Sequence, residues 1–152
     1  MFKHLLAVIA ALVLVLPTTA LASSTRSESS LLREMNRVRV AHGLGRLTTD
    51  THLIRAARSH SREMLGSNVF EHGAFGSRMA QFNVTGTLAG ENLAWGTGVQ
   101  GTARGIVLAW LASPEHRANL LRPSFTRVGI SDVVGSFRGY RGAHVVTADF
   151  AG

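Results

Sequence analysis

The chain of 152 residues contains no cysteine. Disulfide bonds therefore cannot stabilise it, and the stability of the fold must come from the burial of apolar side chains. The same absence excludes thiolate catalysis and zinc sites with thiolate ligands. A metal ion would have to be held by histidine, carboxylate and backbone oxygen atoms.

Long apolar runs are also scarce, and the clearest one lies at the start of the chain. Residues 5–16 are continuously apolar and follow a short basic segment that contains Lys3. This run is too short to span a bilayer comfortably, and Ala20-Leu21-Ala22 has the small-x-small pattern of a cleavage site. We predict a signal peptide over residues 1–22 and an exported mature domain over residues 23–152, without a transmembrane segment. An uncleaved anchor is the alternative.

Lysine is almost missing as well. After Lys3 every basic residue is an arginine, and 15 arginines stand against nine acidic residues. The guanidinium fork matches phosphate and carboxylate groups, so an acidic envelope polymer or an anionic lipid surface suits this charge. The arginines are scattered and the chain is expected to be exported, which argues against nucleic acid as a partner. The alternative is a solvated surface with a bias toward arginine.

The hydrophobic pattern predicts helices first and strands last. The expected helices cover residues 29–41, 51–65, 77–82 and 102–112, with a short one after Pro114, and the expected strands cover residues 128–134 and 143–150. Asp50 is expected to cap the second helix. A long glycine-punctuated loop is expected over residues 67–101. This order predicts one α+β domain with helices packed on an antiparallel sheet.

The second predicted helix has two different faces. His60 lies on its apolar face, and we interpret it as a core-edge histidine with a satisfied hydrogen bond. Arg55, Arg58 and Arg62 form the opposite stripe, which we interpret as the solvent face.

Three residues are candidates for chemistry: His72, Glu91 and His116. Each lies in a segment framed by glycine or proline, which fixes the backbone locally. Ser113 and Pro114 are a helix start signal, and they place His116 in the first turn of a short helix. Two imidazoles and a carboxylate are enough for a zinc site with an open position, or for a general acid and base. The alternative is a polar cluster that serves packing alone.

Three motifs in this order resemble the bacterial secreted branch of the CAP (SCP-like) superfamily, which includes cysteine-rich secretory proteins, venom allergens and plant pathogenesis-related proteins. The motifs are Phe70-Glu71-His72-Gly73, Gly90-Glu91-Asn92-Leu93-Ala94, and Trp110 followed by Ser113-Pro114 and His116. Flanking matches extend the resemblance from Asn36 to Phe150. The resemblance implies a three-layer α-β-α sandwich with a cleft where two histidines and acidic residues meet, sometimes around zinc. His72, Glu91 and His116 fall on those positions.

The chain departs from the family pattern in one respect. Many animal and plant members carry a second cleft glutamate shortly after the helical tryptophan, whereas residues 110–113 here contain no acid. Glu115 is an additional acid, but it adjoins His116 in the sequence. The difference weakens an acid–base mechanism more than it weakens metal binding.

These observations favour a monomeric binding protein that acts outside the cell or at the cell envelope, in an extracellular or periplasmic location. We expect its cleft to hold a divalent cation, zinc in the first place, together with a lipid, peptide or envelope-polymer ligand. One alternative is a zinc-dependent hydrolase, plausibly a peptidase, with Glu115 or a water-linked group as its base. The other is a structural or interaction module in which the three residues tie loops together. Fold analogy alone does not choose among these functions.

Overall fold

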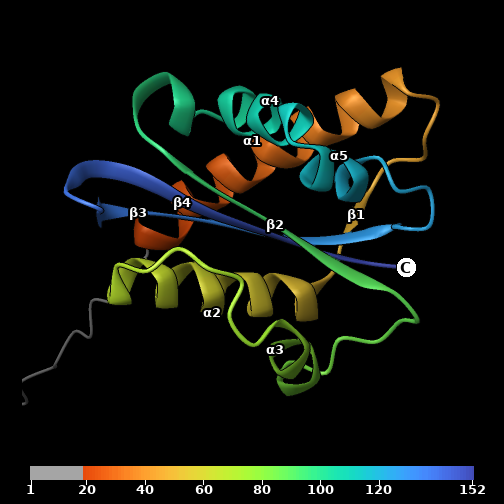
Figure 1. Cartoon of the computed structure of the whole chain (residues 1–152), viewed down its shortest axis with the longest axis horizontal. Helices are drawn as coiled ribbons and strands as arrows, with labels where there is room; N and C mark the ends of the chain where they lie inside the picture. Colours follow the sequence, from red (N-terminus) through yellow and green to blue (C-terminus); the bar gives the residue numbers. More distant parts are fainter. Residues whose placement is uncertain (1–18) are drawn as a thin grey trace, which may run out of the picture.

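In the computed structural model, which describes residues 19–152, helices cover both faces of a four-stranded sheet (Figure 1). Helices α1, α4 and α5 lie on one face, and α2 and α3 lie on the other. The helices are α1 (Thr19–Ala41), α2 (Thr51–Ser67), α3 (Phe75–Gln81), α4 (Ala103–Ala112) and α5 (Pro114–Leu120), and the 3-10 turn η1 covers Gly98–Gly101. The strands are β1 (Thr48–Thr49), β2 (Ala89–Gly96), β3 (Arg127–Phe137) and β4 (Tyr140–Ala151). The predicted α-β-α sandwich is confirmed.

The sheet has the strand order β1-β3-β4-β2, so β2 is an edge strand. Strands β3 and β4 form the predicted antiparallel hairpin, and Arg138 and Gly139 turn it with φ angles of 50° and 85°. Strand β2 pairs antiparallel with β4 on its other side. The two-residue strand β1 runs parallel to β3, so the sheet is mixed.

Two expectations from the sequence are wrong in detail. The sequence assigns the residues of β2 to the long loop, because glycine, glutamate and asparagine have a low preference for strands. These eight residues nevertheless pair with β4, so the neighbouring strand imposes the conformation. Helix α1 begins at Thr19, well before the expected start at residue 29. Polar contacts extend it: Ser27 donates to Asp132, and the Glu28 carboxylate lies 3.2 Å from Arg58.

The other helix boundaries follow the sequence signals closely. The Asp50 side chain accepts from the amides of His52 and Leu53, which confirms the expected cap of α2. Helix α2 ends at Ser67, two residues beyond the expected end, and Asn68 closes it in the left-handed conformation. Ser113 is the residue before α5, as expected, but its side chain makes no capping hydrogen bond. Among the described helices, none is both long and apolar enough to cross a membrane.

The two faces of the sheet differ in polarity. Against α1, α4 and α5 the sheet forms one large apolar cluster around Trp110, where the rings of Phe125 and Phe150 stack 5.3 Å apart. Against α2 and α3 there are two smaller apolar clusters. Polar side chains are buried on this second face, and they include Ser61, Thr147 and Asp149. The candidate site is built from this polar face.

Candidate functional site

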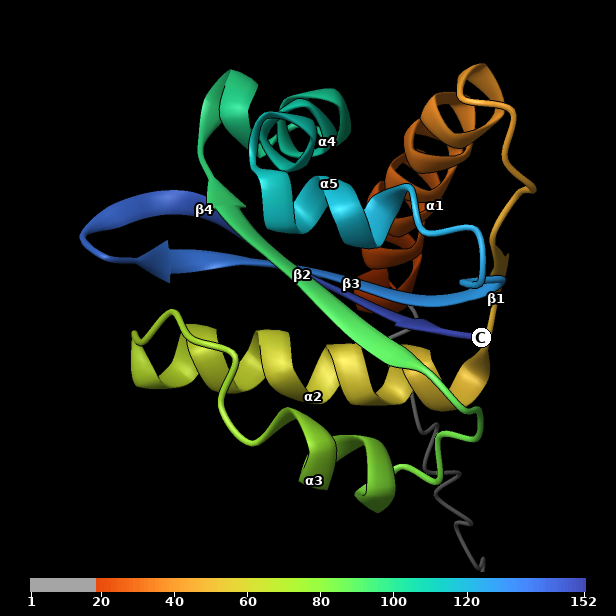
Figure 2. The ribbon, with the colours of Figure 1, turned by 45° about the vertical axis from the view of Figure 1, so that its right-hand side comes forward.

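Strand β2 brings the two sides of the molecule together at an open edge of the sheet. Figure 2 shows β2 between α5 on one side and α2 and α3 on the other. Because successive side chains of a strand point to opposite faces, Glu91 points toward the α2–α3 side and Asn92 toward α5. The edge position leaves room for loops from both layers to meet there.

Glu91 is the centre of the contacts on the α2–α3 side. Its side chain is 3% exposed, and its Oε1 lies 2.7 Å from Nδ1 of His72. Its Oε2 accepts from the guanidinium of Arg78, which is itself buried. Arg78 also donates to the backbone carbonyl of His72, at 3.3 Å. One arginine thus fixes both the carboxylate and the loop that carries the histidine.

His116 reaches the site from α5, which is hydrogen-bonded to β2. The Asn92 amide donates to the carbonyl of His116 at 2.9 Å, and Asn119 donates to Asn92 and to the carbonyl of Glu91. Partial burial lowers the pKa of His116, and the nearby charge of His72 lowers it further, while Glu115 raises it. His116 is therefore neutral at pH 7 and its lone pair is free for a ligand.

His60 lies behind this group, as the sequence predicted for a core-edge histidine. Its imidazole is 2% exposed, and its Nε2 lies 2.8 Å from the carbonyl oxygen of Glu71. The same nitrogen is 3.9 Å from Oε2 of Glu91. His60 therefore holds the loop that precedes His72 and adds a further polar group beside Glu91.

Asp149 is a second acid of the site that the sequence reasoning missed. It is completely buried and is the residue of β4 directly opposite Glu91 in the strand register. Burial raises its pKa well above the usual value, and the charge of Glu91 adds to this, whereas Arg78 opposes it. Neither carboxyl oxygen has a hydrogen-bond partner within the described chain. Burial thus favours the neutral form of Asp149. An acid within the apolar stretch of residues 145–150 was the available signal in the sequence.

Of the three metal ligands that the sequence suggested, the structure leaves the two histidines as possible ligands and engages the glutamate elsewhere. Within residues 19–152, no group of three or more histidine or acidic side chains is already assembled as a metal site. Both oxygens of Glu91 are engaged, one by His72 and one by the positively charged Arg78. The imidazoles of His72 and His116 remain, so they are the residues that would hold a cation. Glu91 would then orient His72 from behind, as carboxylates commonly do for histidine ligands.

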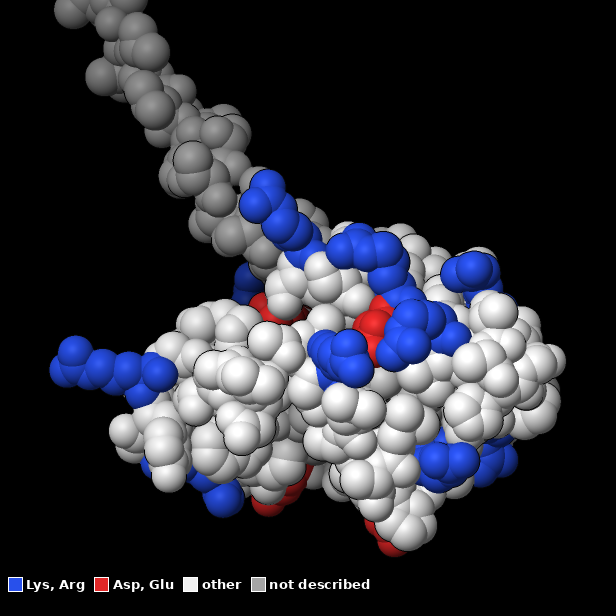
Figure 3. All heavy atoms as spheres, turned by 90° about the horizontal axis from the view of Figure 1, so that it is seen from above, with Lys and Arg blue, Asp and Glu red and all other residues white. Residues whose placement is uncertain are grey.

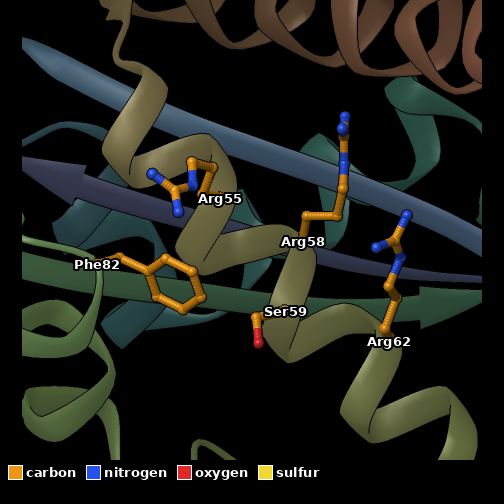
Figure 4. Close-up of a pocket in the computed structure, with 5 residues that line it drawn as sticks. All are labelled: Arg55, Arg58, Ser59, Arg62 and Phe82. Atoms are coloured by element: carbon orange, nitrogen blue, oxygen red, sulfur yellow. The ribbon is translucent and has the colours of Figure 1, made fainter.

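Arginines dominate two surfaces outside this site. On the face over α1 and α4, basic side chains gather around a few acids (Figure 3), and there Arg37 pairs with Glu34 at 2.6 Å. On the outer side of α2, the predicted arginine stripe lines a shallow pocket (Figure 4). Arg58 pairs there with Glu28, and Arg55 lies 5.7 Å from the centre of the Phe82 ring. Arg55 and Arg62 are exposed, as expected for a solvent face, whereas Arg58 is half-buried through its contact with Glu28.

The fold agrees with the comparisons with known proteins. Residues 32–150 match the CAP family, described as the cysteine-rich secretory protein family, and the chain belongs to this family. It is 36% identical over 121 residues to protein YkwD of Bacillus subtilis (strain 168), which covers 76% of this chain and 46% of that protein. It is also 36% identical over 111 residues to the membrane protein YlbC of the same organism, which covers 70% of this chain and 31% of that protein. The chain thus spans less than half the length of these relatives.

Solved structures show the same fold. An extracellular protein with an SCP domain from Bacillus anthracis str. Ames superimposes with a TM-score of 0.71 and 27% identity, over 90% of this chain and 44% of that one. An outer surface protein from Borrelia burgdorferi superimposes with a TM-score of 0.70 and 21% identity, over 82% of this chain and 91% of that one. YlbC and these two proteins are thus described as membrane, extracellular and outer surface proteins respectively.

Proposed function

We propose that this CAP-domain protein is exported and binds a divalent cation, zinc in the first place, between His72 and His116. The single observation that carries the proposal is the setting of His72. Its side chain is 58% exposed, while its Nδ1 is bonded to the buried carboxylate of Glu91. This bond leaves Nε2 as the outward nitrogen and orients the ring, as in a carboxylate–histidine–metal arrangement.

Two neighbouring features support a cation at this position. The lowered pKa of His116 keeps that imidazole neutral at pH 7, and only neutral imidazole coordinates a metal. Two protein ligands leave positions of the ion open, so donor atoms of a lipid, peptide or envelope polymer can complete its coordination. The predicted signal peptide and the extracellular and surface relatives support action outside the cell or at its envelope.

The arrangement supports binding more than hydrolysis. The hydrolase alternative needs a general base, and a carboxylate in that role must be free to accept a proton from water. Glu91 is engaged by Arg78 and His72, and Asp149 is completely buried with a raised pKa. Glu115 is exposed at the start of α5 and adjoins His116 in the chain. When bound, the cation would supply an electrophilic anchor for a ligand oxygen.

Calorimetric titration with Zn²⁺ tests this proposal. We expect saturable one-to-one binding to the wild type and its loss in a His72→Ala/His116→Ala double variant. The matched control is His42→Ala/His52→Ala, because Nδ1 of each of these surface histidines lies 2.8 Å from a backbone carbonyl oxygen. The control should bind zinc like the wild type. Absence of binding to the wild type, or equal binding by the double variant, would contradict the proposal.

A second titration asks whether the cation recruits a ligand. Anionic and neutral lipid vesicles, a mixed peptide pool and a soluble envelope polymer are each added with and without zinc. We expect one of the three classes to bind more tightly when zinc is present, and the gain to be absent in the double variant. Binding that is unaffected by zinc would leave the cation without a role in ligand recognition.

A further inference from the structure

A second histidine–carboxylate pair lies on the opposite face of the sheet. Nδ1 of His144 on β4 lies 2.9 and 3.0 Å from the two carboxylate oxygens of Asp132 on β3. Asp132 is 1% exposed and also accepts from the hydroxyl of Ser27 on α1. The two strands turn these side chains toward α1, as they do the apolar neighbours Ile130 and Val146. The pair is therefore separate from the site around Glu91.

The imidazole of His144 is held in place from two sides. Asp132 holds Nδ1, and Gly101 of η1 packs against the ring edge. A methyl group at Gly101 would come within 2.7 Å of Cδ2 of His144, which is closer than such contacts allow. The ring is 30% exposed, so Nε2 is the nitrogen left for an external partner.

His144 lines a surface hollow of about 360 Å³ together with Arg26 of α1. Within residues 19–152, no acidic side chain pairs with Arg26, and Asp132 is buried behind the imidazole. The hydroxyls of Ser30 and Thr102 also line the hollow, but each donates to a backbone carbonyl. Its wall thus offers a guanidinium and an imidazole without an exposed carboxylate.

We propose that this hollow binds the phosphate group of an organic ligand, between Arg26 and Nε2 of His144. A guanidinium fork alone satisfies a carboxylate, whereas donors from two elements suit the three oxygens of a phosphate. When the ring carries its second proton, Nε2 donates to the anion, and Asp132 behind it keeps the ring oriented. The hollow has the size of a small-molecule site and is larger than one phosphate needs.

Binding of glycerol 3-phosphate, measured by calorimetry and by the ring proton signals of the histidines, tests this inference. We expect saturable binding by the wild type that moves the His144 signals and leaves those of His42 unchanged. Arg26→Gln should weaken binding at least tenfold. Arg62→Gln, which removes the same charge from an exposed position on α2, should change it less than twofold. Inorganic phosphate should bind more weakly, and acetate should not bind measurably.

Other outcomes would overturn the inference. Equal losses in Arg26→Gln and Arg62→Gln would mean that net charge alone attracts the anion. Acetate binding as tightly as glycerol 3-phosphate would reject a phosphate site. His144→Gln should also abolish binding, and thermal unfolding will show whether that variant folds; Arg26 is exposed and tests the site without this complication. The His72→Ala/His116→Ala variant should bind glycerol 3-phosphate normally, so this result and the zinc result are independent.

Discussion

His72 and His144 each present an imidazole whose Nδ1 is bonded to a buried carboxylate, but the two carboxylates have different neighbours. Glu91 also bonds to Arg78 and lies opposite Asp149, whose pKa is raised. Asp132 also bonds to the neutral hydroxyl of Ser27. The negative charge behind His72 is thus balanced by a guanidinium, whereas the ion-pair partner of Asp132 within the described chain is the imidazole of His144.

This difference explains why similar pairs suit ligands of opposite charge. Because Arg78 already balances the charge of Glu91, the outward nitrogen of His72 is left to offer its lone pair to a cation. Beside the second pair, Arg26 lines the same hollow as His144, so this site suits an anion. The residues around each carboxylate, rather than the histidine–carboxylate pair itself, thus determine the charge of the ligand that the site suits.

The largest effect should come from removing the guanidinium of the first pair. Arg78→Ala leaves Glu91 and Asp149 buried without a positive charge, and we expect it to lower the free energy of unfolding by about 3 kcal/mol. Ser27→Ala removes only a neutral hydroxyl from the second pair and should cost about 1 kcal/mol. Urea unfolding measures both values. Equal losses would show that the two carboxylates have the same electrostatic setting.

A smaller effect should come from closing the space beside His144. Gly101→Ala places a methyl group 2.7 Å from the ring and 2.8 Å from the carbonyl oxygen of Gly96. We expect about 2 kcal/mol of destabilisation and displacement of the ring. The matched control is Gly45→Ala, where no atom lies within 4 Å of the added methyl. His144 signals that stay unchanged in Gly101→Ala would contradict the packing described for this pair.

The buried acid of the first pair should make stability depend on pH. Because the pKa of Asp149 is raised in the folded state, the folded protein holds this proton more tightly than the unfolded chain. This part of the stability is complete below the unfolded value and is lost as pH rises toward the folded value. Asp149→Asn should therefore gain stability relative to the wild type as pH rises through that range. A pH-independent difference between the two unfolding free energies would contradict the raised pKa of Asp149.

The smallest effect concerns His116. Burial is the main cause of its lowered pKa and His72 is the second, so His72→Ala should raise this pKa without restoring the usual value. Removing the charge of Glu115 by Glu115→Gln should lower it. A titration of the ring signals of His116 measures both shifts. An unchanged value in His72→Ala would separate the two imidazoles and weaken the proposed cation site.

Local signals in the sequence predicted those parts of the molecule that depend on nearby residues. The Asp50 cap, the break before Pro114 and the β3–β4 hairpin follow from short-range rules. Through the family resemblance, the three motifs predicted that His72, Glu91 and His116 belong to one candidate site. Hydrophobic periodicity also placed His60 correctly in the core.

The remaining parts of the fold and the site depend on contacts between residues far apart in the chain, and the sequence analysis did not predict them. The strand β2 exists because β4 pairs with it, and the same register places Asp149 opposite Glu91, 58 positions away in the numbering. Ser27 and Asp132 are 105 residues apart, yet they meet behind His144. Nothing in the sequence distinguishes Arg78 from the other arginines. Only the fold shows that its guanidinium donates to Glu91. None of these contacts leaves a periodic trace in the sequence.

The most direct test of the account follows the ring signals of all histidines in two separate titrations, one with Zn²⁺ and one with glycerol 3-phosphate. We predict that zinc moves the signals of His72 and His116 and leaves His144 unchanged. Glycerol 3-phosphate should move His144 and leave the other two unchanged. If both ligands moved the same histidines, or if zinc moved His144 alone, the neighbours of each carboxylate would not decide which charge its histidine binds.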